Sequence, residues 1–157
     1  MDSQFRKHVE ALDAKVDRLI ASRGFVYAAL PAAADVPKSG VYLFSRGSHH
    51  LYVGRSNRIR KRLSNHCRPS ATHYQASFAF RLARDRLGIG PATYRPESSR
   101  ESLVQDPRFR RAFEDAKTEV RALTIRFVEE TDQVRQALLE IYAAVRLRTP
   151  HNEFATH

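Results

Sequence analysis

Residues 40–66, GVYLFSRGSHHLYVGRSNRIRKRLSNH, bring together side chains whose chemistry suits a phosphate group. Tyr42 and Tyr52 each lie in a short apolar run, and Arg62 and His66 follow in an RxxxH arrangement. On a helix this spacing places both side chains on one side. A guanidinium can hold two phosphate oxygens, and an imidazole can accept a proton near neutral pH. These residue types favour chemistry on a phosphate, although such a spacing alone is more often a solvated charged face.

The elements that must position these residues follow from the local patterns. Two apolar runs at 41–44 and 51–54, separated by a polar segment with a glycine, predict a β-hairpin. Ser56 is a candidate N-cap for a basic helix over about 57–66, with Ile59 and Leu63 facing the core. The remaining chain predicts a helix over 4–22, a Pro/Ala connector over 28–39, helices over 75–87 and 107–118, and a third strand over 120–128. By composition, 91–105 is the least ordered segment.

The last predicted helix runs from a cap at Thr131 or Asp132 to about Leu147. Helical spacing predicts that its buried face consists of Val134, Leu138, Ile141 and Val145, with Glu140 off the centre of that stripe. The N-terminal helix has a stripe of its own, which predicts packing on the core, with a dimer interface as the less favoured alternative. Its members are Phe5, Val9, Leu12, Val16, Leu19 and Ile20.

Composition bounds the class of protein. A chain of 157 residues with 42% hydrophobic and 28% charged residues predicts one globular domain over 1–157. Its 27 Lys and Arg against 17 Asp and Glu give a formal charge of +10, which favours a polyanionic partner, nucleic acid before an acidic membrane. Neither a membrane-spanning run nor the apolar core of a signal peptide is present, so we expect a cytoplasmic protein without membrane contact.

The single cysteine excludes a disulfide within the chain. Cys67 lies near His66 and His73, so a zinc site is conceivable. However, no CxxC or HxxxH spacing accompanies them, and we do not expect zinc.

The ordered set of motifs resembles the GIY-YIG nucleases. The tripeptides Gly40-Val41-Tyr42 and Tyr52-Val53-Gly54 are similar to the pair that names the family, with valine in place of isoleucine. The RxxxH arrangement, Glu140 within LLEIY and Asn152 after TPH follow in the same order, so that the resemblance covers 38–66 and 121–154. It implies an α+β fold with a small three-stranded antiparallel sheet flanked by helices. On this basis 38–66 and 120–154 form the catalytic core, 1–37 an added N-terminal helix and connector, and 67–119 a helical insertion.

The resemblance also implies a divalent-metal-dependent endonuclease that cleaves phosphodiester bonds in DNA, with RNA as a further substrate, using a single Mg²⁺ or Mn²⁺ ion. Glu140 would bind the metal, and Tyr42 would take the proton from the attacking water with the help of His66. Arg62 would hold the phosphate charge, and Tyr52 would position the water or the phosphate. Three further residues would contact the nucleic acid or brace the site: Arg55, Arg58 and Asn152.

Other interpretations remain open at this point. The chain could be a catalytically silent nucleic-acid-binding module of the same fold, or a basic adaptor for a protein or membrane. The tyrosines could be ordinary strand residues, Glu140 a helix-edge residue and Asn152 a turn former. These residues do not separate restriction or phage defence from repair, and strong sequence specificity in so small a protein would call for a homodimer. The insertion would either extend the DNA-binding surface or only pack. The arginines that make it basic in parts include Arg81, Arg84, Arg86, Arg108, Arg110 and Arg111.

Overall fold

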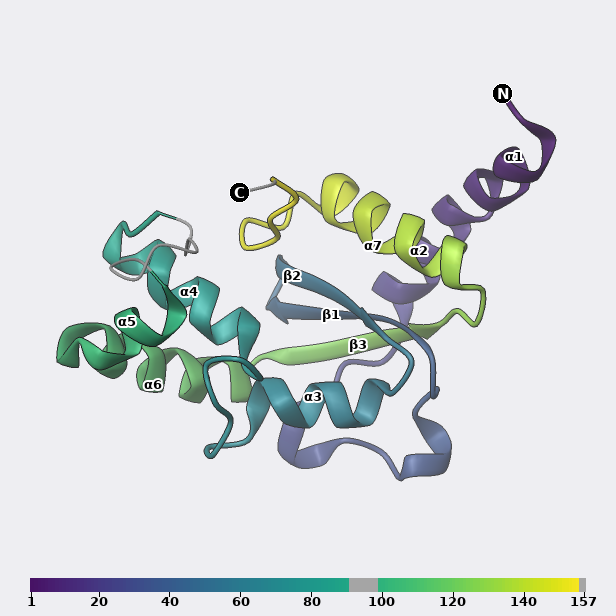
Figure 1. Cartoon of the computed structure of the whole chain (residues 1–157). Coiled ribbons are helices and arrows are strands. Elements are labelled where there is room, and N and C mark those ends of the chain that lie inside the picture. Colours follow the sequence, from purple (N-terminus) through teal and green to yellow (C-terminus); the bar gives the residue numbers. More distant parts are fainter. Residues whose placement is uncertain (91–98, 156–157) are drawn as a thin grey trace. The chain divides into compact units, whose positions relative to one another are not determined.

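The computed structural model describes residues 1–90 and 99–155, which form two compact units (Figure 1). The sheet unit consists of Met1–Arg62 and Leu123–Asn152, and the helical unit consists of Leu63–Ala122 with the C-terminal residues from Glu153. The single domain predicted over 1–157 stays a prediction, since two compact units can belong to one domain. The helical unit nearly coincides with the predicted insertion over 67–119.

The sheet unit is built on a three-stranded antiparallel sheet, which confirms the predicted α+β class. The strands are β1 (Gly40–Arg46), β2 (His49–Ser56) and β3 (Thr124–Glu129), in the order β2-β1-β3. The predicted hairpin is present, and Gly47 turns it with a φ of 57°, a conformation that glycine adopts without steric cost. The third strand begins later than predicted, because Val120 lies in the preceding helix.

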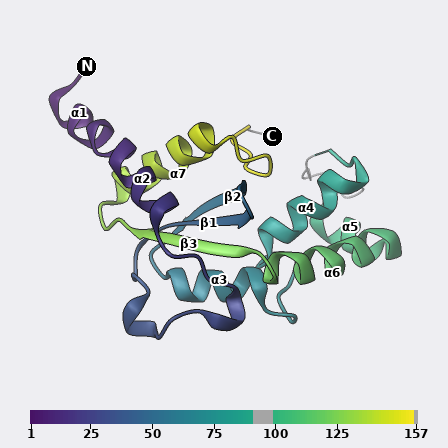
Figure 2. The same ribbon diagram turned by 180° about the vertical axis from the view of Figure 1, so that it is seen from behind.

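One face of the sheet carries the main core. Figures 1 and 2 show α2 (Leu12–Ala21) and α7 (Gln133–Leu147) on this face, and the first turn of α3 (Ile59–Cys67) on the other. Because side chains alternate along a strand, Val41 and Leu43 face the two helices, while Tyr42 and Phe44 face the other way. The helices contribute Leu12, Val16, Leu19, Leu139, Ala143 and Ala144 to this core.

The predicted N-terminal helix is two helices, α1 (Ser3–Glu10) and α2, which meet at Ala11. Asp2 caps α1 by accepting hydrogen bonds from the backbone N–H groups of Gln4 and Phe5. The prediction that Phe5 is buried is wrong, because α1 buries no residue and Phe5 is 43% exposed. Only the α2 part of the stripe reaches the core. The connector contains two 3₁₀ turns, Tyr27–Ala29 and Ala33–Asp35.

The predicted buried face of α7 is wrong for three of its four residues, and only Leu138 packs partly against the core. Asp132 caps the helix as one of the two expected candidates, but Val134, Ile141 and Val145 are 54%, 47% and 66% exposed. The helix instead buries Gln136, Leu139, Ala143 and Ala144. Small alanines let the helix approach the sheet closely, and the Gln136 amide donates to Asn57 Oδ1 and to the Glu130 carbonyl oxygen. A satisfied glutamine can therefore be buried where periodicity alone would choose valine.

The helical unit consists of α4 (Ser77–Leu87), α5 (Arg100–Gln105) and α6 (Pro107–Arg121), with the end of α3. Its core is aromatic: the ring centroid of Phe80 lies 5.0 Å from that of Phe109 and 6.2 Å from that of Phe113. Within the segment predicted to be least ordered, 91–98 lie outside the described residues, whereas the part from Ser99 on caps and forms α5. None of the helices in the described ranges is long and apolar enough to cross a membrane.

Candidate active site

Gly54 and Gly40, the glycines of the two tripeptides, are each required by a different close contact. Tyr42 lies on the central strand, 1% exposed, directly opposite Gly54 on β2. A Cβ atom at Gly54 would lie 2.2 Å from the Tyr42 Oη, so the phenol ring lies across the backbone of the edge strand. A Cβ atom at Gly40 would lie 2.0 Å from the carbonyl oxygen of Val128 on β3. Any larger residue at Gly54 would block the phenol, and any larger residue at Gly40 would push the strands apart.

Four predicted site residues of the sheet unit interact electrostatically, although Tyr42 points away from the face of the sheet that α7 covers. The Tyr42 phenol accepts a hydrogen bond from the Arg62 side chain, and it interacts electrostatically with Tyr52 and Glu140. Glu140 also feels the charge of Arg62. These side chains come from β1, β2, the first turn of α3 and α7, and thus from both halves of the predicted core.

The Tyr42 phenol is neutral in this site. Burial raises its pKa far above the ordinary value near 10, and Tyr52 and Glu140 raise it further, while Arg62 lowers it. At neutral pH Tyr42 therefore carries its proton. It becomes a base only when positive charge beyond that of Arg62 reaches the phenol, or when a neighbouring group accepts its proton.

Glu140 is half-buried and paired. Its Oε2 accepts a hydrogen bond from Arg55 Nε at 2.8 Å. Burial raises the pKa of the carboxyl group, and the contacts with Arg55 and Arg62 lower it. Arg55 was predicted to contact nucleic acid, and here its guanidinium is held by the carboxylate, so it would have to leave Glu140 before it could hold a phosphate.

A metal ion at Glu140 is compatible with the donor atoms present. The described residues contain no group of three or more His, Cys, Asp or Glu able to hold a metal ion. Mg²⁺ is commonly bound by one or two carboxylates, with water and substrate phosphate completing its shell. A single hard carboxylate that lies 24% exposed fits that mode of binding. It does not fit a preformed cage made of protein ligands alone.

Asn152 braces the sheet. Its Oδ1 accepts from the backbone N–H of Val53 at 2.8 Å, and its Nδ2 donates to the carbonyl oxygen of Val53 at 2.7 Å. Thr149, at the end of α7, donates its hydroxyl to the same Oδ1 at 2.8 Å. Both amide atoms are thus used by protein groups, which supports a bracing role rather than the predicted contact with nucleic acid. Thr149 was not singled out from the sequence, and only its place in the TPHN segment pointed to it.

His66 and Arg58 are positioned by α3. His66 is fully buried one turn after Arg62, but it belongs to the helical unit, so its role as proton acceptor for Tyr42 remains a prediction. Arg58 is exposed just before the helix, where its backbone N–H donates to Ser56 Oγ at 2.9 Å. Its position leaves the guanidinium accessible to a phosphate.

Cys67 is buried, and burial raises the pKa of its thiol to about 12. A zinc ligand would have to be a thiolate, so this environment disfavours the zinc site considered from the sequence.

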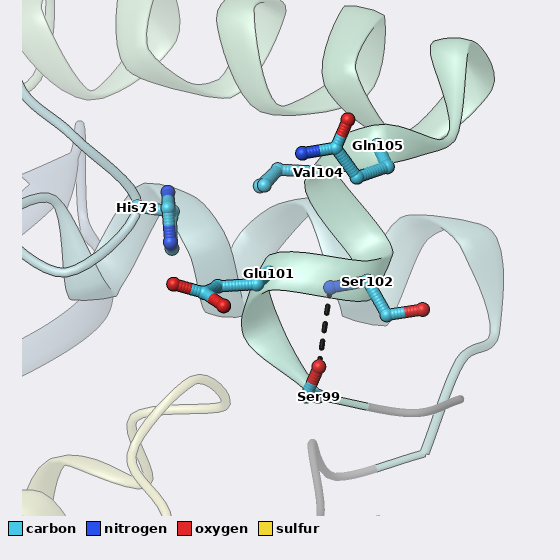
Figure 3. Close-up of a pocket in the computed structure, with 6 residues that line it drawn as sticks. All are labelled: His73, Ser99, Glu101, Ser102, Val104 and Gln105. Atoms are coloured by element: carbon cyan, nitrogen blue, oxygen red, sulfur yellow. Dashed lines mark hydrogen bonds between the residues drawn. The ribbon is translucent and has the colours of Figure 1, made fainter. Parts of the chain in front are cut away.

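A separate hollow of about 640 Å³ lies in the helical unit (Figure 3). Its lining consists of His73, Ser99, Glu101, Ser102, Val104 and Gln105. Ser99 caps α5 by accepting from the Ser102 N–H, and Glu101 accepts from the Tyr74 hydroxyl at 3.1 Å. Among the described residues this lining contains an acid and no Lys or Arg, a composition that does not suit a phosphate.

Comparisons with family models, with curated proteins and with solved structures found no match for this chain. The likeness to the GIY-YIG nucleases therefore depends on the motif residues and on the geometry described above.

Proposed function

We propose that this protein is a divalent-metal-dependent endonuclease that hydrolyses phosphodiester bonds in DNA. The observation that carries the proposal is the position of Glu140, within electrostatic reach of the Tyr42 phenol and of Arg62. In a surface that only binds DNA, a carboxylate would repel the phosphates. In a hydrolytic site the same carboxylate has a purpose, because it can hold a cation against the substrate.

The roles follow from the chemistry of each side chain. Glu140 would hold Mg²⁺ or Mn²⁺, which when bound supplies a Lewis acid that stabilises negative charge on the phosphate and the leaving oxygen. Arg62 would bind a non-bridging phosphate oxygen. Tyr52 would position the attacking water or the scissile phosphate, and Arg58 would contact a neighbouring phosphate. Asn152 would keep the edge strand in place beneath the site.

Tyr42 would orient the attacking water and, once deprotonated, accept its proton. Because burial keeps the phenol neutral, deprotonation needs an acceptor, and His66 is the predicted one. The raised pKa of Tyr42 therefore leads us to expect cleavage that accelerates as the pH rises through the neutral and alkaline range.

A second candidate is a nucleic-acid-binding module of the same fold without catalysis. The burial of Tyr42, at 1% exposure, favours it, since a buried neutral phenol is a poor base. In this case the tyrosine would serve as a packing residue against Gly54, and the basic surface would bind DNA without cutting it.

Incubation of supercoiled plasmid with the protein tests the two candidates. The assay uses Mg²⁺ or a chelator, with Glu140→Gln as the matched variant and a filter-binding measurement in parallel. The endonuclease proposal expects nicking by the wild type with metal only, and DNA binding without cleavage by the variant. If both proteins bind and neither cuts any DNA or RNA, the binding module is correct. If neither binds, the basic adaptor is the remaining interpretation.

A further inference from the structure

We propose that the outward face of α7 is a self-association surface, which pairs with the same face of a second copy of this chain in antiparallel orientation. The α7 stripe consists of Val134, Leu138, Ile141 and Val145. This inference is independent of the nuclease proposal, since none of these residues belongs to the candidate active site.

The α7 stripe is unusual for the solvent side of a helix. Val134, Ile141 and Val145 are 54%, 47% and 66% exposed, and Leu138 is half-buried. At about 100° per residue the four side chains fall within an arc of about 60°. The opposite side buries Gln136 and two alanines besides Leu139. The helix thus leaves Val134, Ile141 and Val145 exposed, as many branched aliphatic side chains as it packs on the core through Leu138, Leu139 and Leu147. An exposed apolar stripe of this kind is typical of an interaction surface.

The spacing of the stripe identifies a second copy as the occupant. Its members are four, three and four residues apart, which reads the same in both directions. When two copies of α7 lie antiparallel, Val134 therefore lies opposite Val145 of the second copy, and Leu138 lies opposite Ile141. Each contact occurs twice, as a two-fold axis requires, and similar spacings let helices interlock in antiparallel pairs. An unrelated partner would have no reason to match a symmetric pattern.

Charge complementarity favours the same orientation. The exposed Arg148 lies at the C-terminal end of α7, while the exposed Glu129 and the half-buried Asp132 lie at its N-terminal end. An antiparallel pair brings Arg148 next to Asp132 of the second copy, whereas a parallel pair would bring two Arg148 side chains together. The helix dipoles also oppose one another in the antiparallel pair, which is the favourable arrangement.

Glu140 lies about 120° around α7 from the centre of the stripe, again at about 100° per residue. Pairing through the stripe would therefore leave the flank that carries Glu140 uncovered in each copy.

Sedimentation measured over a range of protein concentrations tests the surface. We expect a concentration-dependent dimer for the wild type and at least a tenfold higher dissociation constant for the double variant Ile141→Glu/Val145→Glu. The matched control is Val26→Glu, which changes a residue that is 42% exposed away from α7 and should dimerise as the wild type does. A wild type that stays monomeric throughout would overturn the proposal, as would a double variant that dimerises unchanged.

Cysteine crosslinking tests the orientation and does not depend on the folding of the charged double variant. Val134→Cys and Val145→Cys are made as separate variants, since the native Cys67 is buried. A disulfide needs Cα atoms roughly 4.4–6.8 Å apart, so the antiparallel pair crosslinks only a mixture of the two variants under mild oxidation. Crosslinking of each variant with itself but not of the mixture would show a parallel pair and would contradict the proposal.

Discussion

Two ion pairs of the same kind, one in each unit, differ only in what surrounds them. Glu140 pairs with Arg55 in the sheet unit, and Glu119 pairs with Arg86 in the helical unit. The exposed fractions of the side chains nearly coincide, 24% and 44% in the first pair against 23% and 43% in the second. Glu140 also interacts electrostatically with Tyr42 and with a second arginine, Arg62. An ion pair of this kind therefore does not by itself mark a functional site. The neighbouring Tyr42 and Tyr52 phenols and Arg62 distinguish the Glu140 pair from the Glu119 pair.

The two units also differ in their charge and in how their arginines are paired. The sheet unit has 16 basic and 9 acidic residues, and the helical unit has 11 and 8. In the helical unit Arg81 pairs with Asp85, and both Arg81 and Arg84 pair with Glu153. With Arg86 also paired, three of the six arginines thought to extend a DNA surface serve packing. Arg108, Arg110 and Arg111 are exposed, and Arg110 Nε donates to the Val104 carbonyl oxygen at 3.1 Å, so the remaining part of that prediction depends on these three.

The largest expected effect separates the two glutamates. Glu140→Gln should lower the rate of metal-dependent plasmid nicking by about 10²-fold or more, because it removes the only charged metal ligand of the proposed site. Glu119→Gln breaks the equivalent pair in the helical unit and should leave the rate within about twofold, as expected for a partly exposed ion pair. Equal loss of activity in both variants would show that the neighbours of Glu140 give it no special role in cleavage.

The next largest difference is expected in the stability of two glycine variants, one in each unit. Gly54→Ala should lower the free energy of unfolding by about 1–3 kcal/mol, because its Cβ atom meets the Tyr42 ring. Gly90→Ala in the helical unit has no atom of the described residues within 4 Å of the new Cβ and should change stability by less than about 0.5 kcal/mol. Urea unfolding followed by circular dichroism measures both. A neutral Gly54→Ala variant would mean that Tyr42 does not depend on that glycine.

Buried charges provide a comparison of pH dependence. The Glu130 side chain is 1% exposed, and burial alone would raise its pKa. Hydrogen bonds from Arg135 and the Asp132 N–H, with the charge of Lys15, outweigh burial and hold the pKa below 4.5. The folded pKa is thus below the unfolded one, so the stabilisation is present above about pH 4.5 and is lost as the pH falls through the folded value.

Glu130→Gln should therefore cost about 1–3 kcal/mol at pH 7 and flatten the acid limb of the stability curve between pH 5 and pH 3. One buried charge of the helical unit is the cation Lys117, held by the carbonyl oxygens of Pro69 and Ala71 and paired with the exposed Glu114. Lys117→Met should lower stability without flattening that limb. Thermal unfolding measured at each pH distinguishes the two, and an unchanged acid limb in Glu130→Gln would contradict the expectation.

The smallest effect concerns DNA affinity. Arg58→Ala should weaken binding a few-fold and reduce the slope of log K against log salt by about 1, as expected when one phosphate contact is lost. Arg86→Ala removes an arginine already paired with Glu119 and should leave that slope unchanged. Fluorescence anisotropy over a salt series provides the measurement. A larger loss for Arg86 than for Arg58 would place the DNA surface on the helical unit.

Local pattern predicted the hairpin, the basic helix and the existence of the third strand, because each depends on neighbouring residues. It failed where several elements compete for one surface. The α7 stripe is the most apolar face of its helix, yet the sheet accepts the face with Ala143 and Ala144, since α2 already fills the space that larger side chains would need. Likewise Val120 continues α6 instead of starting β3. Neither outcome can be read from periodicity within one segment.

In the candidate site, too, the sequence predicted some features and not others. Motif order predicted Tyr42, Tyr52, Arg62 and Glu140 as site residues, and in the structure the Tyr42 phenol interacts electrostatically with the other three. Spacing could not predict the Arg55–Glu140 ion pair, because the two residues lie 85 positions apart in the chain. Nor could it predict that Asn152 would be used by the backbone of Val53.

The bonds that Asn152 makes have a consequence for the solubility of the protein. As the outer strand, β2 has backbone groups with no neighbouring strand on one side, and such groups can recruit extended segments of other molecules. The backbone N–H of His151 donates to the carbonyl oxygen of Leu51, and Asn152 bonds the backbone of Val53. Residues 151–152 therefore bond the outer edge of β2 at Leu51 and at Val53, two residues further on. Residues 151–152 thus cover part of the exposed edge of β2 with hydrogen bonds, and this cover protects the sheet against edge-to-edge aggregation.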